Sequence, residues 1–328
     1  MPGRTREAGG LAVRRGPTAA TPVRAAARAL LAAALLCRAA FAATAEAGAP
    51  AISGLAARAT IAELTLLERL NRSVRFDAEV AIKAEWGDSY GRIDVVELPD
   101  VENRYALFED DARRRVDVAI RGTVNLKNAL FDIEFLKSRS ASLGISLHGG
   151  FERVAAALYA DLRPRIRDGY SIRIAGHSLG AAEAIIAGMF LARDGCRVEL
   201  VLASAPPKVT DAEGWSRFPL LPVVRLVGPY DPVPFLPPKD LLYGRDPYVQ
   251  GGPALLLLDG AKYTILDSSF FDCMPDEARK AFGEGRHFAA ADHLIGAYLA
   301  RLESKAGGAE YVGPEGWERY ATAAPGGR

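Results

Sequence analysis

Stretches with helix-like and strand-like spacing of apolar residues alternate along most of this chain. Residues 104–110 and 113–122 predict the two arms of a β-hairpin that turns at Asp110 and Asp111, and 254–266 predicts a second hairpin that turns at Asp259 and Gly260. Apolar runs of strand type occupy 171–176, 197–204 and 223–228. Helical periodicity marks 60–70, 151–167, 179–193 and 291–303, with Pro164 expected to kink or end the second of these helices.

Alternating strands and helices are typical of an α/β fold with a mostly parallel sheet covered on both faces. We expect a signal-like or disordered segment over residues 1–45, one domain over 46–305, and a flexible Gly- and Pro-rich tail over 306–328. The pattern leaves open whether residues 46–100 are integral to the domain or form an accessory flap.

Composition and charge narrow the classes of function. The 328 residues are 49% hydrophobic and 25% charged, which excludes a disordered, collagen-like or coiled-coil chain. The net charge of +1 is uneven, because residues 1–45 carry seven arginines and one acid whereas the remainder has a net charge of −5. A mildly acidic body without a basic stripe excludes nucleic acid as a partner.

The first 45 residues have the layout of an export signal. An Arg-rich stretch over 1–28 precedes a nine-residue apolar run over 29–37, and A-x-A cleavage sites end at Ala42 and Ala45. A run this short predicts no transmembrane segment in the mature chain, because a bilayer-spanning helix needs about 20 apolar residues. We therefore expect a secreted or periplasmic protein; the alternatives are an organelle transit peptide or a disordered extension of a cytoplasmic protein. Cleavage would leave Cys196 and Cys273, whose pairing the sequence does not settle.

A G-x-S-x-G pentapeptide over 176–180 carries the first candidate chemistry. A predicted strand leads into it and an apolar helix follows, which is the context of a nucleophile elbow that exposes Ser178 above a sheet. The alternative is an ordinary strand–helix turn in which the serine only caps the helix.

A serine nucleophile requires a base and an orienting acid, which follow it in the order Ser, Asp or Glu, His in such folds. His293, in the first turn of the last predicted helix, is favoured as the base over His287 in a Gly-rich loop. Asp231 directly follows a strand, between stiffening prolines, and is favoured as the acid. Later carboxylates in turn-like contexts remain alternatives, namely Asp240, Asp246, Asp259 and Asp267.

Several blocks in this order resemble the class 3 lipase family of the α/β-hydrolases, typified by fungal triacylglycerol lipases. They are VAIRGTVNLKNALFDIEF (118–135), HGGF (148–151), IAGHSLGAAEA (174–184), SAPPKV (204–209), YDPVPFLPP (230–238) and DHLIGAYL (292–299). The chain departs from the family at 205–209, where Ala-Pro-Pro-Lys-Val replaces a Gly-x-Pro-Arg-Val-like segment. The resemblance implies an α/β-hydrolase fold, and for His148 a structural place at a helix start.

The resemblance also implies an oxyanion hole and a lid. Thr123, after Arg121 and Gly122, would supply its backbone N–H and hydroxyl, and Leu179 its backbone N–H. The lid would be an amphipathic helix over 126–133, for which the alternative is a fixed core helix. Its apolar residues are Leu126, Ala129, Leu130, Phe131 and Ile133.

Together these features predict a serine carboxylic-ester hydrolase, a lipase acting on acylglycerols or related lipid esters through Ser178, Asp231 and His293. Alternatives with the same triad are a phospholipase A1, an aryl-ester or polyester esterase and a thioesterase; a more distant one is a non-catalytic lipid- or partner-binding protein. The expected partners are a small-molecule lipid or ester substrate and, transiently, a lipid interface. The reaction is expected to need neither a metal nor an organic cofactor.

Overall fold

The computed structural model describes residues 59–122, 137–237, 247–272 and 291–321. Several sequence predictions fall outside these ranges. They are the export signal, Thr123, the proposed lid over 126–133, Asp240, Asp246, Cys273 and His287.

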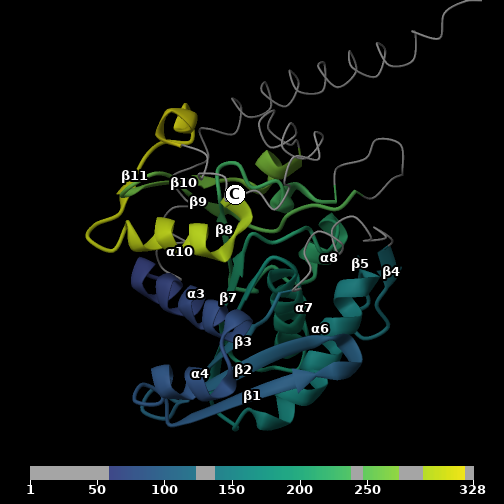
Figure 1. Ribbon diagram of the computed structural model, residues 1–328. Helices are drawn as coiled ribbons and strands as arrows, with labels where there is room; N and C mark the ends of the chain where they lie inside the picture. The colour runs from purple at the N-terminus through teal and green to yellow at the C-terminus, as the bar shows by residue number, and fades with distance from the viewer. Residues whose placement is uncertain (1–58, 123–136, 238–246, 273–290, 322–328) are drawn as a thin grey trace, which may run out of the picture. The chain divides into compact units, whose positions relative to one another are not determined.

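Nine strands of the described chain form one sheet in which the spatial order follows the chain order (Figure 1). They are β1 (Arg92–Leu98), β2 (Asn103–Asp110), β3 (Arg115–Ile120), β6 (Ser171–His177), β7 (Val198–Ser204), β8 (Val223–Val227), β9 (Ala254–Leu257), β10 (Lys262–Leu266) and β11 (Glu310–Tyr311). The strands from β3 to β9 run parallel, while β1, β2 and β10 join by antiparallel pairing. Both predicted hairpins are therefore present, as β2–β3 and β9–β10.

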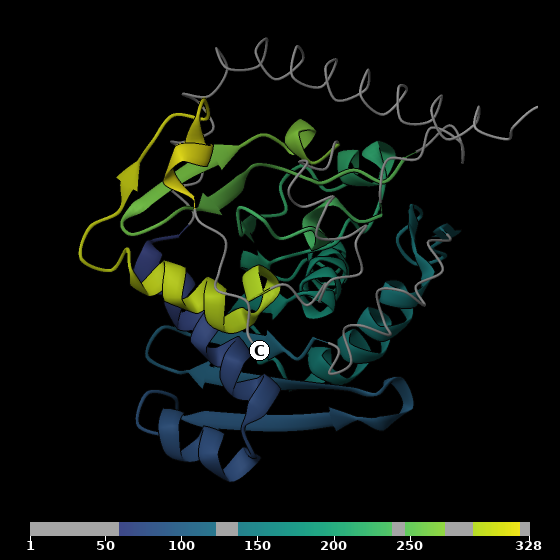
Figure 2. The same cartoon turned by 45° about the horizontal axis from the view of Figure 1, so that its top comes forward.

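Helices cover both faces of this sheet (Figures 1 and 2). One apolar core lies under α6 (Gly149–Leu162), α7 (Leu179–Arg193) and α8 (Ala212–Ser216). The other lies under α3 (Ile61–Phe76), α4 (Glu79–Trp86) and α10 (Ile295–Glu303). Every residue of β6 is buried, as expected for a central parallel strand between two cores. This is the mostly parallel sheet with helices on both faces that the sequence predicts.

Local sequence explains where the principal helices begin and end. Thr60 and Glu63 form a reciprocal capping box at the start of α3. Helix α6 ends at Leu162, and Pro164 lies in the 3₁₀ turn η3 (Arg163–Arg165) that follows, as predicted. The shorter elements are β4 (Lys137–Arg139), β5 (Ser146–His148), η2 (Pro99–Val101), η4 (Val233–Phe235), η5 (Ser268–Asp272), η6 (Ala291–His293) and η7 (Trp317–Tyr320).

The structure answers the question that the sequence left open about residues 46–100. Within the described part of this range, β1 pairs with β2 at the edge of the main sheet, and Leu67, Leu70 and Val74 of α3 are completely buried in its second core. These elements are therefore integral to the domain rather than an accessory flap.

The C-terminal segment differs from the flexible tail expected over 306–328. Strand β11 pairs in parallel with β10, and Trp317 in η7 is only 4% exposed. The backbone oxygen of Tyr320 also accepts a hydrogen bond from the amide of Asp259. Gly- and Pro-rich sequence suggested a loose end, but these tertiary contacts fix residues 310–320 against the sheet.

Candidate active site

Ser178 occupies the sharp turn between β6 and α7. Its backbone has φ = 60° and ψ = −126°, a strained conformation for a residue with a side chain. The amide of Ser178 donates to the backbone oxygen of Ser204 at 2.9 Å, which fixes the turn to β7. A Cβ on Gly180 would lie 2.7 Å from the backbone oxygen of Ile120, so the turn requires glycine there. This is the geometry of a nucleophile elbow.

His293 joins Ser178 to Asp231 in one hydrogen-bonded line. Its Nε2 lies 2.9 Å from Oγ of Ser178, and its Nδ1 lies 2.9 Å from Oδ2 and 3.0 Å from Oδ1 of Asp231. Because an ionised carboxylate only accepts hydrogen bonds, Nδ1 carries the ring hydrogen and Nε2 can accept the serine proton. All three side chains are buried, with exposed fractions of 1%, 1% and 0% for Ser178, His293 and Asp231. The structure thus brings together the three residues that the sequence selected.

His293 lies in η6 rather than in the helix predicted over 291–303. Leu294 has an extended backbone and separates this 3₁₀ turn from α10. The interruption places the imidazole in the 3₁₀ turn directly before α10.

Tyr298 holds the acid of this line in place. Its hydroxyl donates to Oδ2 of Asp231 at 2.7 Å and accepts the amide hydrogen of Gly228 at 2.7 Å. The amide of Val233 donates to Oδ1 of Asp231 at 2.9 Å. Burial raises the pKa of Tyr298 far above its usual range, so the hydroxyl remains a donor at physiological pH. Sequence analysis did not identify this contact, because it joins positions 67 residues apart.

Burial and charge suit His293 to act as a base. Burial lowers the pKa of its imidazole, and the nearby Asp231 carboxylate opposes this effect. The positive charge of Arg75, at the end of α3, further lowers the pKa of His293. The Arg75 guanidinium lies near Gly122, where Nη1 is 3.2 Å from the position that a Cβ would occupy. A lowered pKa leaves the ring neutral and able to accept a proton at neutral pH.

The described chain contains part of the predicted oxyanion hole. Leu179 is the first residue of α7, and the first amides of a helix have no acceptor within that helix. Gly122 packs against the elbow, but the next residue, Thr123, is outside the described ranges. The role of Thr123 therefore remains a prediction.

Other histidine and aspartate candidates have separate structural places. His148 caps α6 by accepting the amide hydrogen of Phe151 through Nδ1 at 3.4 Å, and burial lowers the pKa of its ring to about 4. It therefore lies at a helix start, as the resemblance implied. Asp259 pairs with Arg301 at 2.7 Å, and Asp267 accepts the amide hydrogen of Ser269 at 2.9 Å.

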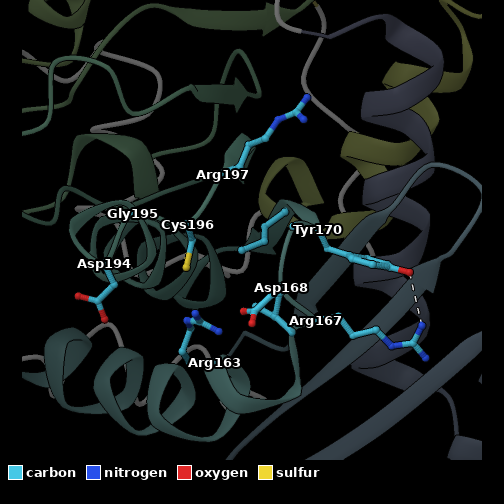
Figure 3. Close-up of a pocket in the computed structure, with 11 residues that line it drawn as sticks. Arg163, Arg167, Asp168, Tyr170, Asp194, Gly195, Cys196 and Arg197 are labelled. Atoms are coloured by element: carbon cyan, nitrogen blue, oxygen red, sulfur yellow. Dashed lines mark hydrogen bonds between the residues drawn. The ribbon is translucent and has the colours of Figure 1, made fainter.

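A pocket opens at the opposite end of β6, close to the ends of α6 and α7 (Figure 3). Its lining includes Arg163, Asp194, Tyr170 and the unpaired Cys196. Ser178 follows the last residue of β6 and this pocket adjoins the first, so the two are about 20 Å apart. No residue of the Ser178–His293–Asp231 line contributes to this pocket.

The described ranges contain neither a candidate metal site nor a candidate membrane-spanning helix. Within those ranges, no group of three or more histidine, cysteine, aspartate or glutamate side chains could bind a metal ion. In the same part of the chain, no helix has the length and apolarity needed to span a membrane.

Among known proteins, fungal lipases are similar to this chain in sequence and in structure. The secreted mono- and diacylglycerol lipase 1 of Fusarium solani is 29% identical over 157 residues, which is 44% of this chain and 46% of that protein. The chain thus aligns with less than half the length of this relative. The Rhizomucor miehei lipase propeptide complex has a TM-score of 0.49 and 19% identity, covering 61% of this chain and 70% of the other. The lipase of Rhizopus microsporus var. chinensis has a TM-score of 0.48 and 21% identity, covering 61% and 76%.

The segment of the chain that matches a protein-family model contains two of the three hydrogen-bonded site residues. Residues 117–241 match the family described as Lipase (class 3), a segment that contains Ser178 and Asp231 and ends before His293. Over residues 117–241, the chain is therefore similar to the class 3 lipase family.

Proposed function

We propose that this protein is a serine carboxylic-ester hydrolase, a lipase that acts on acylglycerols or related lipid esters. The observation that carries the proposal is the unbroken hydrogen-bonded line from Oγ of Ser178 through His293 to Asp231. The match of residues 117–241 to the class 3 lipase family and the similarity to a Fusarium protein named as a mono- and diacylglycerol lipase support the choice of substrate.

The proposed reaction proceeds through an acyl-enzyme. Ser178 attacks the ester carbonyl carbon while Nε2 of His293 takes the hydroxyl proton, and Asp231 stabilises the resulting imidazolium. The amide of Leu179, together with Thr123, would bind the tetrahedral oxyanion, and each such donor lowers the barrier by about 3–4 kcal/mol. His293 then gives its proton to the leaving alcohol. Water activated by the same imidazole attacks the acyl-enzyme, releases the carboxylic acid and restores Ser178.

We propose transient contact with a lipid interface near the entrance to this site. Leu294, the neighbour of His293, is 50% exposed although its side chain is large and apolar. Ser178 is 1% exposed in this state, so an ester must displace some of the atoms that cover it. The amphipathic sequence over 126–133 is the proposed lid. Equal specific activity toward dissolved and aggregated forms of one ester would contradict this part of the proposal.

We also propose that the chain is exported. Its first 45 residues have the layout of a signal sequence, and the Fusarium relative is named as a secreted protein. Expression with residues 1–45 included should yield a mature chain that begins after Ala42 or Ala45 in the extracellular or periplasmic fraction. An uncleaved chain retained in the cytoplasm would contradict export without affecting the proposed chemistry.

A fluorophosphonate probe tests the proposed chemistry directly. The wild-type protein should acquire one phosphonyl group on Ser178, and Ser178→Ala should acquire none. The same preparation is then assayed with tri-, di- and monoacylglycerols, phospholipids, thioesters and short aryl esters. Labelling together with highest kcat/KM on acylglycerols supports the proposal, whereas highest kcat/KM on another class would reassign the substrate. Absence of Ser178 labelling would favour a non-catalytic binding protein.

A further inference from the structure

The histidine that precedes the nucleophile contacts the backbone of the proposed base. Nε2 of His177 lies 2.8 Å from the backbone oxygen of His293. A carbonyl oxygen can only accept a hydrogen bond, so Nε2 of His177 carries a hydrogen and donates it. The rings of His177 and His293 are 5.2 Å apart between centroids. His177 therefore holds the η6 loop, residues 291–294, through the main chain of His293.

A carboxylate from α3 faces the other nitrogen of the same ring. Oε1 of Glu68 lies 3.3 Å from Nδ1 of His177, and neither atom has a hydrogen-bond partner of standard geometry within the described chain. Oε2 of Glu68 accepts hydrogen bonds from Oγ of Ser204 at 2.7 Å and Nδ2 of Asn71 at 3.1 Å. Glu68 is completely buried and His177 is 4% exposed. Two hydrogen-bond donors and the His177 ring thus surround a carboxyl group that the proposed reaction does not use.

The chemistry of the two facing atoms requires a proton between them. If Glu68 is ionised, Nδ1 must carry a hydrogen to give an attractive contact; if Glu68 is protonated, its hydroxyl points toward the Nδ1 lone pair. Both forms are neutral overall and both leave Nε2 of His177 as a donor. The form without this proton would set a carboxylate against a nitrogen lone pair in a buried place, which is costly. Glu68 therefore maintains the hydrogen on Nε2 of His177 that binds the His293 carbonyl.

We propose that Glu68 and His177 are positioning residues for His293, and that helix α3 is thereby part of the catalytic unit. The inference rests on the proposed hydrolase function. Neither side chain contacts the reacting atoms; they act through the main chain of His293, whose ring must remain aligned with both Ser178 and Asp231. Helix α3 precedes the segment 117–241 that matches the family, so Glu68 acts on His293 from outside that segment.

The expected effect is on the rate of the chemical step. A displacement of about 1 Å in a reacting group can reduce a rate by roughly 100-fold. Removing the polar group of Glu68 should allow the η6 loop to shift by a smaller amount, so we expect kcat to fall between about 10- and 100-fold. The KM for a dissolved ester should remain within twofold, because Glu68 contacts no part of the substrate.

Substitutions at Glu68 separate positioning from simple stabilisation. In Glu68→Leu the side chain has no acceptor or donor for His177, whereas in Glu68→Gln the amide nitrogen can donate to Nδ1 and the amide oxygen can accept from Ser204 and Asn71. Glu109→Leu is the matched control, because Glu109 is also a completely buried carboxylate but pairs with Arg167 at 3.0 Å near the far end of the sheet.

The measurement is the reaction of each variant with the fluorophosphonate probe, analysed as two quantities. The number of labelled sites reports the folded, competent fraction, and the rate constant per labelled site reports alignment of Ser178 with His293. Glu68→Leu should lower the rate constant per site at least 10-fold, and Glu68→Gln should remain within about threefold of wild type. Glu109→Leu should change only the number of sites.

Two results would overturn the inference. One is a rate constant per site in Glu68→Leu within twofold of wild type; the other is a Glu68→Gln rate as low as that of Glu68→Leu. If Glu68→Leu does not fold, His177→Gln and His177→Leu replace it, because only the glutamine can donate toward the His293 carbonyl; equal rates in these two variants would then overturn it. Failure of the wild-type protein to react at all would instead overturn the proposed function and, with it, the need for positioning.

Discussion

The hydroxyl of Tyr298 donates a 2.7 Å hydrogen bond to Oδ2 of Asp231, the same carboxylate oxygen that lies 2.9 Å from Nδ1 of His293. The hydrogen bond from buried Tyr298 therefore helps to orient the Asp231 carboxylate toward the imidazole. Because Tyr298 is in α10 and its hydroxyl also accepts the amide hydrogen of Gly228, the bond couples the last helix to the loop after β8. Removal of this hydroxyl should affect both stability and catalysis.

Tyr298→Phe tests this relationship. The substitution removes a hydrogen bond to a charged group, which should reduce the free energy of unfolding by about 1.5–3 kcal/mol. It should also lower kcat about 10-fold, because Asp231 loses one of the groups that orient it. Chemical denaturation and steady-state ester hydrolysis measure the two effects.

Tyr90→Phe is the matched control for this experiment. Tyr90 also donates to a buried aspartate, at 2.8 Å to Oδ2 of Asp117, but it lies in another part of the fold. It should lose stability without a comparable loss of kcat. If the two variants lose kcat equally, the hydroxyl of Tyr298 has no specific part in orienting Asp231.

The acid limb of the pH–rate profile should lie below the ordinary histidine range. His293 acts as a base only when neutral, and burial lowers its pKa, so kcat/KM should persist below pH 6.5 and fall as the ring becomes protonated. Arg75→Gln removes a positive charge that contributes to this lowering, and the acid limb should move to higher pH. A profile of kcat/KM on a dissolved ester between pH 4 and 9 measures the shift.

Arg72→Gln provides the comparison for Arg75→Gln. Arg72 is on the same helix and has the same charge, but its side chain is exposed. Solvent should screen its effect, so its acid limb should coincide with that of the wild-type protein. An acid limb that moves to lower pH in Arg75→Gln would contradict the inferred electrostatic effect.

Stability should fall as the pH rises toward 8 because of Glu183. Burial raises the pKa of this carboxyl to about 8. The hydrogen bond that Nδ2 of Asn103 donates to it at 2.5 Å lowers the pKa and only partly offsets the effect of burial. The folded state keeps the proton above pH 4.5 whereas the unfolded chain loses it, so unfolding releases a proton across this interval. The stabilisation is complete below pH 4.5 and is progressively lost as the pH rises through about 8.

Glu183→Gln should remove this dependence. The amide cannot ionise, so the variant should exceed the wild-type free energy of unfolding by on the order of 3 kcal/mol at pH 7, and the difference should shrink toward pH 4.5. Urea denaturation at pH 5, 6, 7 and 8 compares the two proteins. Parallel dependence of stability on pH would contradict the assignment of a buried, protonated Glu183.

Local patterns predicted the elements that build the site. The apolar run before Gly176 and the apolar helix after Gly180 predicted β6, α7 and the elbow, because a buried parallel strand and its following helix have a strong periodic signal. Chain order then selected Asp231 and His293, which the structure brings together with Ser178. The strained φ of Ser178 is also implied by the pentapeptide itself.

The supporting contacts could not be predicted in the same way. Glu68 reads as one charged position in an amphipathic helix, and its approach to Ser204 joins positions 136 residues apart. Strand β11 has only two residues, and the burial of Trp317 depends on contacts across the fold rather than on periodicity. Such features arise from packing between distant segments, for which one sequence offers no spacing rule.

The most direct test of the account is ester turnover by purified Ser178→Ala. Its circular dichroism spectrum and unfolding midpoint should match those of the wild-type protein, while kcat on a dissolved short-chain ester should fall on the order of 10⁶-fold, as expected when a serine nucleophile is removed. A folded Ser178→Ala protein that retained a tenth of the wild-type turnover would contradict the central claim.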